Sequence, residues 1–313
     1  MSLIALLFVL LAPIPKTPYD GTIAVTMRSP RPVLLLLKPD GKEVRRIELT
    51  DLPNLYTVKN SRNAEWALVT NLAGNSQVNN RFYSLQDGHL VKWDGSVKPK
   101  RIVEGRASLK WVLNRDATKA YGTEVDVDKV AMDASATKSW EVDLATGNQK
   151  PIKLPAGHSI IDISLDDATV VLQGYEKNQY LMKFVTTKDW KATEIEGGSY
   201  YPHGLSPDAG KVMATEYLPG ENGGPPRSEL VIFDRETKAK VTIPKPAEIQ
   251  SISAYTYGAD GKRIAFSGSL QERQDNGRLT LIYRIFVANA DGTGVKKIYE
   301  TTNGEIISDI DWR

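Results

Sequence analysis

Four carboxylate side chains fall within one ten-residue segment of the sequence. They are Glu124, Asp126, Asp128 and Asp133. Carboxylate oxygens are the ligands that Ca²⁺ prefers in proteins, so the segment is a candidate metal site. Its spacing is not that of an EF-hand, because neither the glycine nor the closing glutamate of that loop falls in place. We expect a solvated acidic loop and no cofactor, with a bound Ca²⁺ as the alternative.

The three histidines are the other residues with obvious chemistry. His89 follows an Asp-Gly pair and is expected to lie exposed in a turn. His158 and His203 each stand where an apolar segment begins, and His203 closely follows Tyr200 and Tyr201. An imidazole can bind a metal or transfer a proton. We predict a binding patch of Tyr200, Tyr201, His203 and His158, in which ordinary hydrogen-bonded histidines are favoured over a metal or catalytic pair.

Other catalytic signatures are missing from the sequence. It contains no Gly-x-Ser-x-Gly elbow, Walker A loop, dinucleotide fingerprint or His-Glu-x-x-His motif. The absence of cysteine excludes thiolate catalysis, disulfides and lipidation at cysteine. The 313 residues include 40 Lys and Arg against 38 Asp and Glu, and a formal charge of +2 gives no indication of a nucleic-acid partner. These features favour a globular binding protein over an enzyme.

An internal repeat indicates the elements that position these residues. A turn-forming Asp or Asn recurs between apolar segments at intervals of 42 to 53 residues. These anchor residues are Asp20, Asn63, Asp116, Asp166, Asp208 and Asp260. A short carboxylate or amide side chain can hydrogen-bond the backbone two residues on, which suits a tight turn. Each anchor therefore predicts a hairpin between a first and a second strand, and six anchors at this period are typical of β-propeller blades.

A third apolar segment, a second turn and a fourth segment follow each anchor. The third segments are 33–37, 82–85, 140–144, 181–185, 230–233 and 285–288. Fourth segments such as 44–47 carry Lys and Arg, as suits an exposed edge strand. The first unit lacks a first strand, while 305–313 is a first strand without an anchor. We predict an all-β, six-bladed β-propeller of four-stranded antiparallel blades over residues 19–313, closed by pairing of the C-terminal strand with the N-terminal strands.

The best-preserved copies of the repeat resemble those of a known family. Ser206-Pro-Asp-Ala-Gly-Lys-Val212 and Ala259-Asp-Gly-Lys-Arg-Ile-Ala-Phe266 resemble the WD40-like (PD40) repeats of TolB-like β-propellers. Trp312 resembles the Trp that precedes Ser-Pro-Asp-Gly in that family. The resemblance covers about residues 20–313 and implies a TolB-like propeller that serves as a binding protein or scaffold. TolB also carries an N-terminal α/β domain, which these residues do not include, so the binding of its lipoprotein partner is not implied.

Four of the six connections between second and third strands are long. They comprise residues 73–80, 124–133, 218–226 and 269–277. Equivalent connections emerge on one face of a propeller, and insertions often mark the binding face. We expect this face to bind a protein or a small ligand without catalysis, although tolerated surface variation explains the insertions equally well. The alternative function is a lyase or hydrolase that acts on a glycan in the central channel near His203 and His158.

An unbroken apolar run, residues 3–12, precedes the repeats. It is shorter than the roughly 20 residues that span a bilayer, and its length suits the core of a secretory signal. No Lys or Arg precedes it, and a buried first strand is the competing interpretation, but three prolines follow by residue 18. We predict that residues 1–18 are a signal-like segment and Pro-rich spacer, without a transmembrane span. The expected location is periplasmic or secreted, with cytoplasmic as the alternative.

Overall fold

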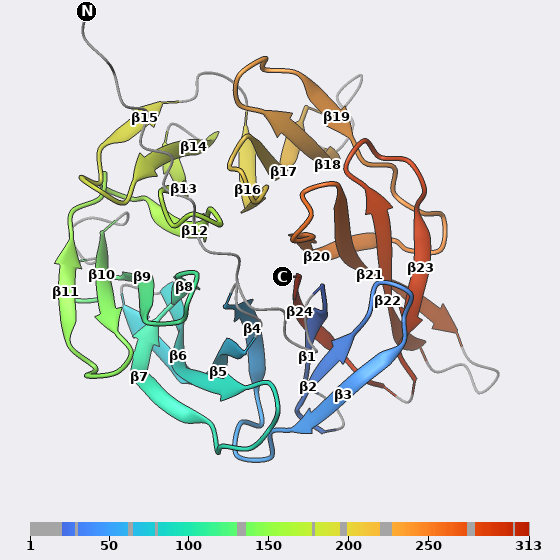
Figure 1. The fold of residues 1–313 in the computed structure, drawn as a ribbon, viewed down its shortest axis with the longest axis horizontal. Coiled ribbons are helices and arrows are strands. Elements are labelled where there is room, and N and C mark those ends of the chain that lie inside the picture. Colours follow the sequence, from blue (N-terminus) through green and yellow to red (C-terminus); the bar gives the residue numbers. More distant parts are fainter. Residues whose placement is uncertain are drawn as a thin grey trace, which may run out of the picture.

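The computed structural model describes residues 21–28, 31–61, 65–78, 81–129, 136–176, 179–194, 199–219, 227–273, 279–302 and 304–312. They form six four-stranded antiparallel sheets, arranged as the blades of a ring around a central channel (Figure 1). The predicted six-bladed β-propeller is therefore confirmed. The signal-like segment 1–18 and the anchors Asp20 and Asn63 lie outside the described residues. No helix within the described ranges is both long and apolar enough to cross a membrane.

The blades are numbered from the one that contains both ends of the described chain. Blade 1 consists of β24 (Ile307–Trp312), β1 (Ile23–Met27), β2 (Val33–Leu37) and β3 (Glu43–Glu48). Blade 2 consists of β4 (Leu55–Asn60), β5 (Trp66–Val78), β6 (Arg81–Lys92) and β7 (Lys100–Ala107), and blade 3 of β8 (Lys110–Leu113), β9 (Lys119–Val125), β10 (Thr137–Asp143) and β11 (Gln149–Ile152). Blade 4 consists of β12 (Ser159–Ile163), β13 (Thr169–Glu176), β14 (Gln179–Thr186) and β15 (Ala192–Glu194). Blade 5 consists of β16 (Tyr200–Leu205), β17 (Lys211–Leu218), β18 (Arg227–Asp234) and β19 (Lys240–Thr242), and blade 6 of β20 (Ser251–Tyr257), β21 (Arg263–Arg273), β22 (Leu279–Asn289) and β23 (Lys296–Glu300).

The described anchor residues form the turns that their side chains predict. Asp208 Oδ1 accepts hydrogen bonds from the Gly210 N–H at 3.0 Å and from the Ser206 hydroxyl at 2.6 Å. The next residue, Ala209, has a φ of +55°, in the left-handed region. The equivalent residues of three other turns also have positive φ: Ala117, Asp167 and Gly261. Large or β-branched side chains fit this conformation poorly, which explains why a small residue or Asp follows each anchor.

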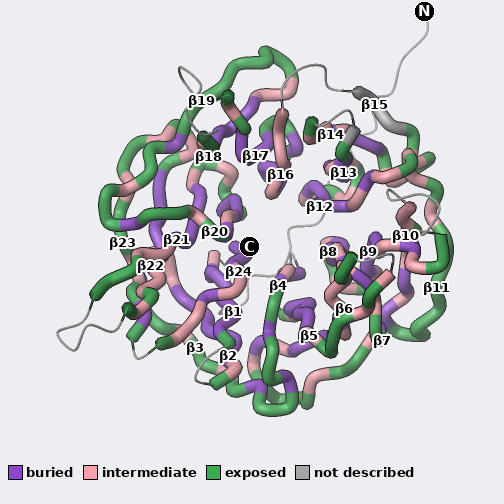
Figure 2. Tube along the Cα trace, turned by 180° about the vertical axis from the view of Figure 1, so that it is seen from behind, coloured by how far each residue is buried: buried purple, intermediate pink, exposed green. Residues whose placement is uncertain are grey.

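The core lies between neighbouring blades. All five residues of β2 are buried, whereas the outermost strands β3, β7 and β19 are largely exposed, as their Lys and Arg indicate (Figure 2). Tryptophan rings fill spaces that glycine leaves open in the neighbouring backbone. A Cβ atom at Gly122 would lie 2.3 Å from the ring of Trp140, so this close approach requires glycine.

The ring closes as the sequence predicts. β24 pairs antiparallel with β1, and Ile23 lies opposite Trp312. The buried indole of Trp312 donates from Nε1 to the carbonyl oxygen of Gly21 at 3.1 Å. The carboxylate of Asp311 accepts the Asn60 N–H at 2.7 Å, which ties β24 to the innermost strand of blade 2. The last strand therefore completes blade 1 and also joins it to its neighbour.

Asp87-Gly88 does not form the turn that the sequence predicts. β6 continues through this pair to Lys92, and its register against β7 is irregular on both sides of Gly88. The turn forms at Asp94-Gly95, where Gly95 has a φ of +67°. The expectation that His89 is exposed is therefore wrong, because a strand residue at this position is buried. Gly88 allows close packing instead, since a Cβ there would lie 2.0 Å from the ring of Trp111.

Two of the four connections expected to be long loops are largely strand. Residues 73–78 belong to β5 and residues 269–273 to β21, so these second strands are extended. The ends of both strands are mostly exposed, so their residues do not alternate between apolar and polar. Without that alternation the sequence predicts a loop instead of a strand. Parts of the other two connections, 124–133 and 218–226, lie outside the described residues.

Candidate functional site

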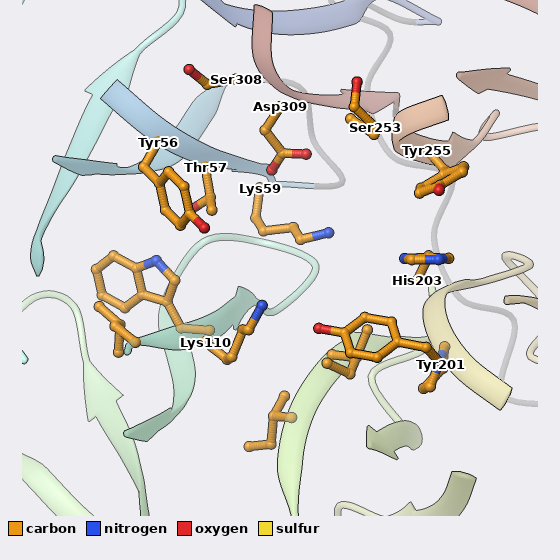
Figure 3. Close-up of a pocket in the computed structure, with 16 residues that line it drawn as sticks. Tyr56, Thr57, Lys59, Lys110, Tyr201, His203, Ser253, Tyr255, Ser308 and Asp309 are labelled. Carbon is orange, nitrogen blue, oxygen red and sulfur yellow. The ribbon is translucent and has the colours of Figure 1, made fainter. Parts of the chain in front are cut away.

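The innermost strands of all six blades line one cavity in the central channel (Figure 3). Its volume is about 250 Å³. The polar and aromatic side chains of the lining include Tyr56, Thr57, Lys59, Lys110, Tyr201, His203, Ser253, Tyr255, Ser308 and Asp309. Six equivalent strands that run in the same direction bring side chains from distant parts of the sequence to one place.

Two lysine ammonium groups point into this cavity from adjacent blades. Lys59 extends from β4 and Lys110 from the start of β8 (Figure 3). Within the described part of the chain, neither ammonium lies within 4.0 Å of a carboxylate oxygen. Burial lowers the pKa of Lys110, but Tyr201 and Tyr56, and after them the Asp309 carboxylate, outweigh burial, and the pKa is raised overall. Lys110 is therefore a cation at neutral pH.

Asp309, on β24, is the acidic residue in the described lining of the cavity. Burial raises the pKa of its carboxyl group to about 6, while Lys59 and a backbone hydrogen bond oppose the rise. That bond comes from the Val58 N–H, which donates to Oδ2 at 3.0 Å. Asp309 thus hydrogen-bonds the backbone of β4, and two lysines against one carboxylate leave the lining positive.

His203 lies across the cavity from the two lysines (Figure 3). Burial, together with the positive charges of Lys59 and Lys110, lowers the pKa of its imidazole to about 3. Its Nε2 lies 2.7 Å from the Thr215 hydroxyl oxygen. Its ring stacks on Tyr255, with ring centroids 4.0 Å apart and planes 28° apart. At neutral pH His203 is therefore an uncharged aromatic wall, with a pKa far from that of an efficient general acid.

A row of tyrosine rings connects the cavity with the surface. Tyr201 meets Tyr180 edge to face, with ring centroids 5.2 Å apart. Tyr180 in turn stacks on Tyr217 and contacts Tyr175, each with centroids 5.1 Å apart. Tyr217 and Tyr175 are 41% and 51% exposed. The tyrosine row, Tyr175, Tyr180, Tyr201 and Tyr217, thus offers ring surfaces on which a flat ligand can stack.

The structure places Tyr201 and His203 of the predicted patch in the cavity lining. Tyr200 takes a different direction, and its hydroxyl donates to the carboxylate of Glu216 at 3.3 Å. Tyr200 and Tyr201 are successive strand residues whose side chains point to opposite faces of the sheet, so Tyr201 lines the cavity and Tyr200 does not. Only part of the Tyr200–His203 stretch therefore faces the channel.

His158 is fully buried and does not belong to the described lining of the cavity. Its Nδ1 lies 2.8 Å from the carbonyl oxygen of Ala156. Its Nε2 edge packs on the backbone of Gly174, where a Cβ would come within 2.4 Å. The two imidazoles of His158 and His203 are thus not brought together around the cavity.

The acidic segment around residue 126 is compensated by cations. Glu124 pairs with Arg106 at 2.8 Å, and Asp126 lies 3.5 Å from Lys129. Lys138 lies within 4.0 Å of carboxylate oxygens of both acids and of Asp128, whose side chain is 83% exposed. Asp133 lies outside the described residues. Within the described ranges, no group of three or more His, Asp or Glu residues is arranged to hold a metal ion.

The two ends of the channel differ in their surface chemistry. At one end of the channel the innermost strands begin and the second strands of the blades end. We call this end the hairpin face, and Phe82, Tyr175, Tyr217 and Leu279 lie there. The opposite end, which carries the anchor turns Asp116, Asp166, Asp208 and Asp260, is the turn face. Large apolar side chains that are exposed on the hairpin face, by their positions in the strands, are Tyr56, Phe82, Tyr175, Tyr217, Leu279 and Leu281. Among the described residues, two other large apolar side chains are exposed away from the hairpin face: Val97 on the turn face and Val241 on an outermost strand.

Solved structures show what this architecture is similar to. TolB from Acinetobacter baumannii matches with a TM-score of 0.64 and 12% identity, over 95% of this chain and 67% of that chain. The chain has the propeller fold of TolB. A chain of a nidogen/laminin complex matches with a TM-score of 0.61 and 9% identity, over 94% of this chain and 98% of that one. Oligogalacturonate lyase from Vibrio parahaemolyticus matches with a TM-score of 0.51 and 15% identity, over 90% and 79% respectively.

The predicted resemblance to TolB-like propellers is thus confirmed at the level of the fold. No protein-family model and no curated protein matches the sequence. Identities this low establish the fold alone, and the three matched proteins show that different functions use it. Function must therefore be inferred from the cavity and from the surface around it.

Proposed function

We propose that this chain is an exported, non-enzymatic propeller that binds a protein partner through its hairpin face. The observation that carries the proposal is the concentration of exposed apolar side chains on that face, at the ends of β6, β13, β17 and β22. Scattered apolar residues are ordinary on a protein surface, but a concentration on one face is typical of an interaction site. A propeller of the same fold occurs in a complex of nidogen with laminin, which supports a protein as the kind of partner.

Export is part of the proposal because of the apolar run at residues 3–12, which has the length of a secretory signal core. The absence of cysteine is compatible with an oxidising compartment. Cell fractionation followed by N-terminal sequencing of the purified protein tests this part. An exported protein is recovered outside the cytoplasm without residues 3–12, whereas a cytoplasmic protein that retains residues 3–12 contradicts this part of the proposal.

The geometry gives less support to the alternative function, an enzyme that acts on a glycan. It needs His158 and His203 to act together in the channel, but only His203 lines the cavity. The low pKa of His203, about 3, leaves it unprotonated over the neutral range. Binding is the function that these residues support best.

The experiment compares two matched pairs of substitutions. Phe82→Ser with Leu279→Ser removes two apolar side chains from the hairpin face, whereas Val97→Ser with Val241→Ser removes two from elsewhere. All four side chains are exposed, so both double variants should fold normally. The tagged proteins are cross-linked in cells, the partner is identified by mass spectrometry, and its affinity is then measured with purified components.

We expect the hairpin-face variant to weaken binding of the partner by about tenfold or more, as loss of two buried apolar contacts implies. The control variant should bind like the unmodified chain. Loss of binding in the control with retention in the hairpin-face variant overturns the proposal.

A further inference from the structure

We propose that the cavity of the central channel is a binding site for a small ligand that carries a carboxylate or phosphate group, held by Lys59 and Lys110. This site adjoins the protein-binding surface proposed above, because Tyr56 belongs to both. It lies among the innermost strands, and its ligand is recognised by charge as well as by contact with aromatic rings.

The first argument is the charge of the lining. Two other partly buried cations of the molecule have a close carboxylate: Arg106–Glu124 at 2.8 Å and Arg284–Glu300 at 2.7 Å. Lys59 and Lys110 have none within 4.0 Å among the described residues, although both are partly buried in the channel. A cation removed from water is costly unless it is paired. Two such cations in one cavity indicate a place for an anion.

The second argument is the geometry of the donors. Lys59 and Lys110 come from β4 and β8, which are adjacent in the ring, and both side chains turn into the cavity (Figure 3). The hydroxyl of Tyr201 points toward Lys110 from the opposite side (Figure 3). Ammonium and hydroxyl groups that converge in this way supply several charge-assisted hydrogen bonds to a carboxylate or phosphate. The charge of Asp309 acts on both Lys59 and Lys110, but one carboxylate cannot neutralise two ammonium groups, so a net positive charge remains for a ligand.

The third argument concerns the size and the far wall of the cavity. Its volume of about 250 Å³ equals roughly eight water molecules at their share of liquid volume, about 30 Å³ each. That volume suits a ligand of one small ring with a charged substituent. His203 and Tyr255, stacked on each other across from the lysines, present an uncharged aromatic wall. Sugar acids and sugar phosphates combine an anionic group with a ring that packs on such a wall.

The test uses D-galacturonate, inorganic phosphate and D-galactose as probes of the full chain. Galacturonate and galactose differ in that the acid carries a carboxylate, so their comparison isolates the charge. The chain has three histidines, which makes the imidazole signals of His203 assignable by NMR. A bound anion offsets the positive charges that help to lower the pKa of His203, so binding should shift its signals and raise that pKa.

We expect galacturonate, phosphate or both to shift the His203 signals, and galactose to leave them unchanged. A response to galacturonate alone assigns the ligand to the sugar acids, and a response to phosphate alone assigns it to the phosphates. Lys59→Met and Lys110→Met should each weaken binding by about tenfold to a hundredfold, as the loss of a charge-assisted hydrogen bond implies. Lys42→Met, at an exposed turn residue, is the matched control and should bind normally.

Either of two results overturns this inference: no shift of the His203 signals with either anion at 10 mM, or a shift that persists when Lys59 and Lys110 are both replaced. Circular dichroism and thermal unfolding of each variant confirm that it is folded before it is scored. The Phe82→Ser and Leu279→Ser variant should retain the anion response, so failure of this inference and failure of the partner-binding proposal are separate outcomes.

Discussion

Replacement of Trp312 by alanine should open the ring at its closing strand. The indole is 1% exposed within the core cluster of blades 1 and 6, and its Nε1 donates to the Gly21 carbonyl oxygen. Truncation of a buried Trp to Ala costs about 3–5 kcal/mol of unfolding free energy. At roughly 2 °C per kcal/mol for a chain of this size, the midpoint of thermal unfolding should fall by about 6–10 °C. Differential scanning calorimetry measures this change.

A matched control separates closure from simple loss of core packing. Trp93 is equally buried, in the cluster between blades 1 and 2, and Trp93→Ala should cost a similar free energy. Hydrogen exchange distinguishes the two variants, because β1 pairs with β2 on one side and with β24 on the other, and loosening of β24 leaves one side of β1 without partners. We expect faster exchange of the amides of residues 23–27 in Trp312→Ala than in Trp93→Ala. Equal exchange in both variants, or a midpoint shift below about 2 °C, would refute the role assigned to the closing strand.

Three further predictions concern pH, packing and metal. Burial lowers the pKa of His203 to about 3, so the unfolded chain takes up its proton first, and this residue destabilises the fold as pH falls from about 6.5 toward 3. Burial raises the pKa of Asp309 to about 6, so its contribution to stability instead declines as pH rises from about 4 to 6. His203→Phe and Asp309→Asn should therefore change the slope of unfolding free energy against pH in opposite directions. Each slope should change by at most about 1.4 kcal/mol per pH unit. Urea unfolding between pH 4 and 7 measures these slopes, and parallel profiles of the two variants contradict the prediction. Gly122→Ala should destabilise the chain by about 1–3 kcal/mol, because a Cβ would lie 2.3 Å from the Trp140 ring, whereas Gly74→Ala, with no atom within 4 Å, should change little in the same assay. Since the described carboxylates of the acidic segment pair with cations, EDTA and millimolar Ca²⁺ should both leave the midpoint of thermal unfolding unchanged, and a rise of several degrees with Ca²⁺ would support the calcium alternative.

The fold could be predicted from sequence because its turns carry their own chemistry. Asp208 and its equivalents hold the turn through a side-chain hydrogen bond, and the residue that follows must tolerate positive φ. These local requirements recur at intervals of 42 to 53 residues, which indicates the number of blades. The same reasoning predicted one turn at the wrong position. Asp87-Gly88 has the composition of a turn, but Gly88 is required because the Trp111 ring packs against its backbone. A contact between blades is not visible in the local sequence.

The candidate site was harder to predict, since it depends on which side of each innermost strand faces the channel. The sequence pattern predicted Tyr201 and His203, because aromatic and imidazole side chains have evident binding chemistry. It did not predict Lys59 and Lys110. One signal was present: Lys110 is a single charge between Leu109 and Trp111, at the start of an apolar first strand. A charge in that position either faces a channel or lacks a partner. The convergence of Lys59 with Lys110 depends on the order of the blades, which only the structure supplies.

The most direct test of the recognition role is a hydrogen–deuterium exchange map of the chain with and without its purified partner. Binding through the hairpin face predicts slower exchange in residues 81–86 and 279–283, with little change around residues 93–97 on the turn face. Slower exchange confined to the turn face would contradict the assignment of the binding surface.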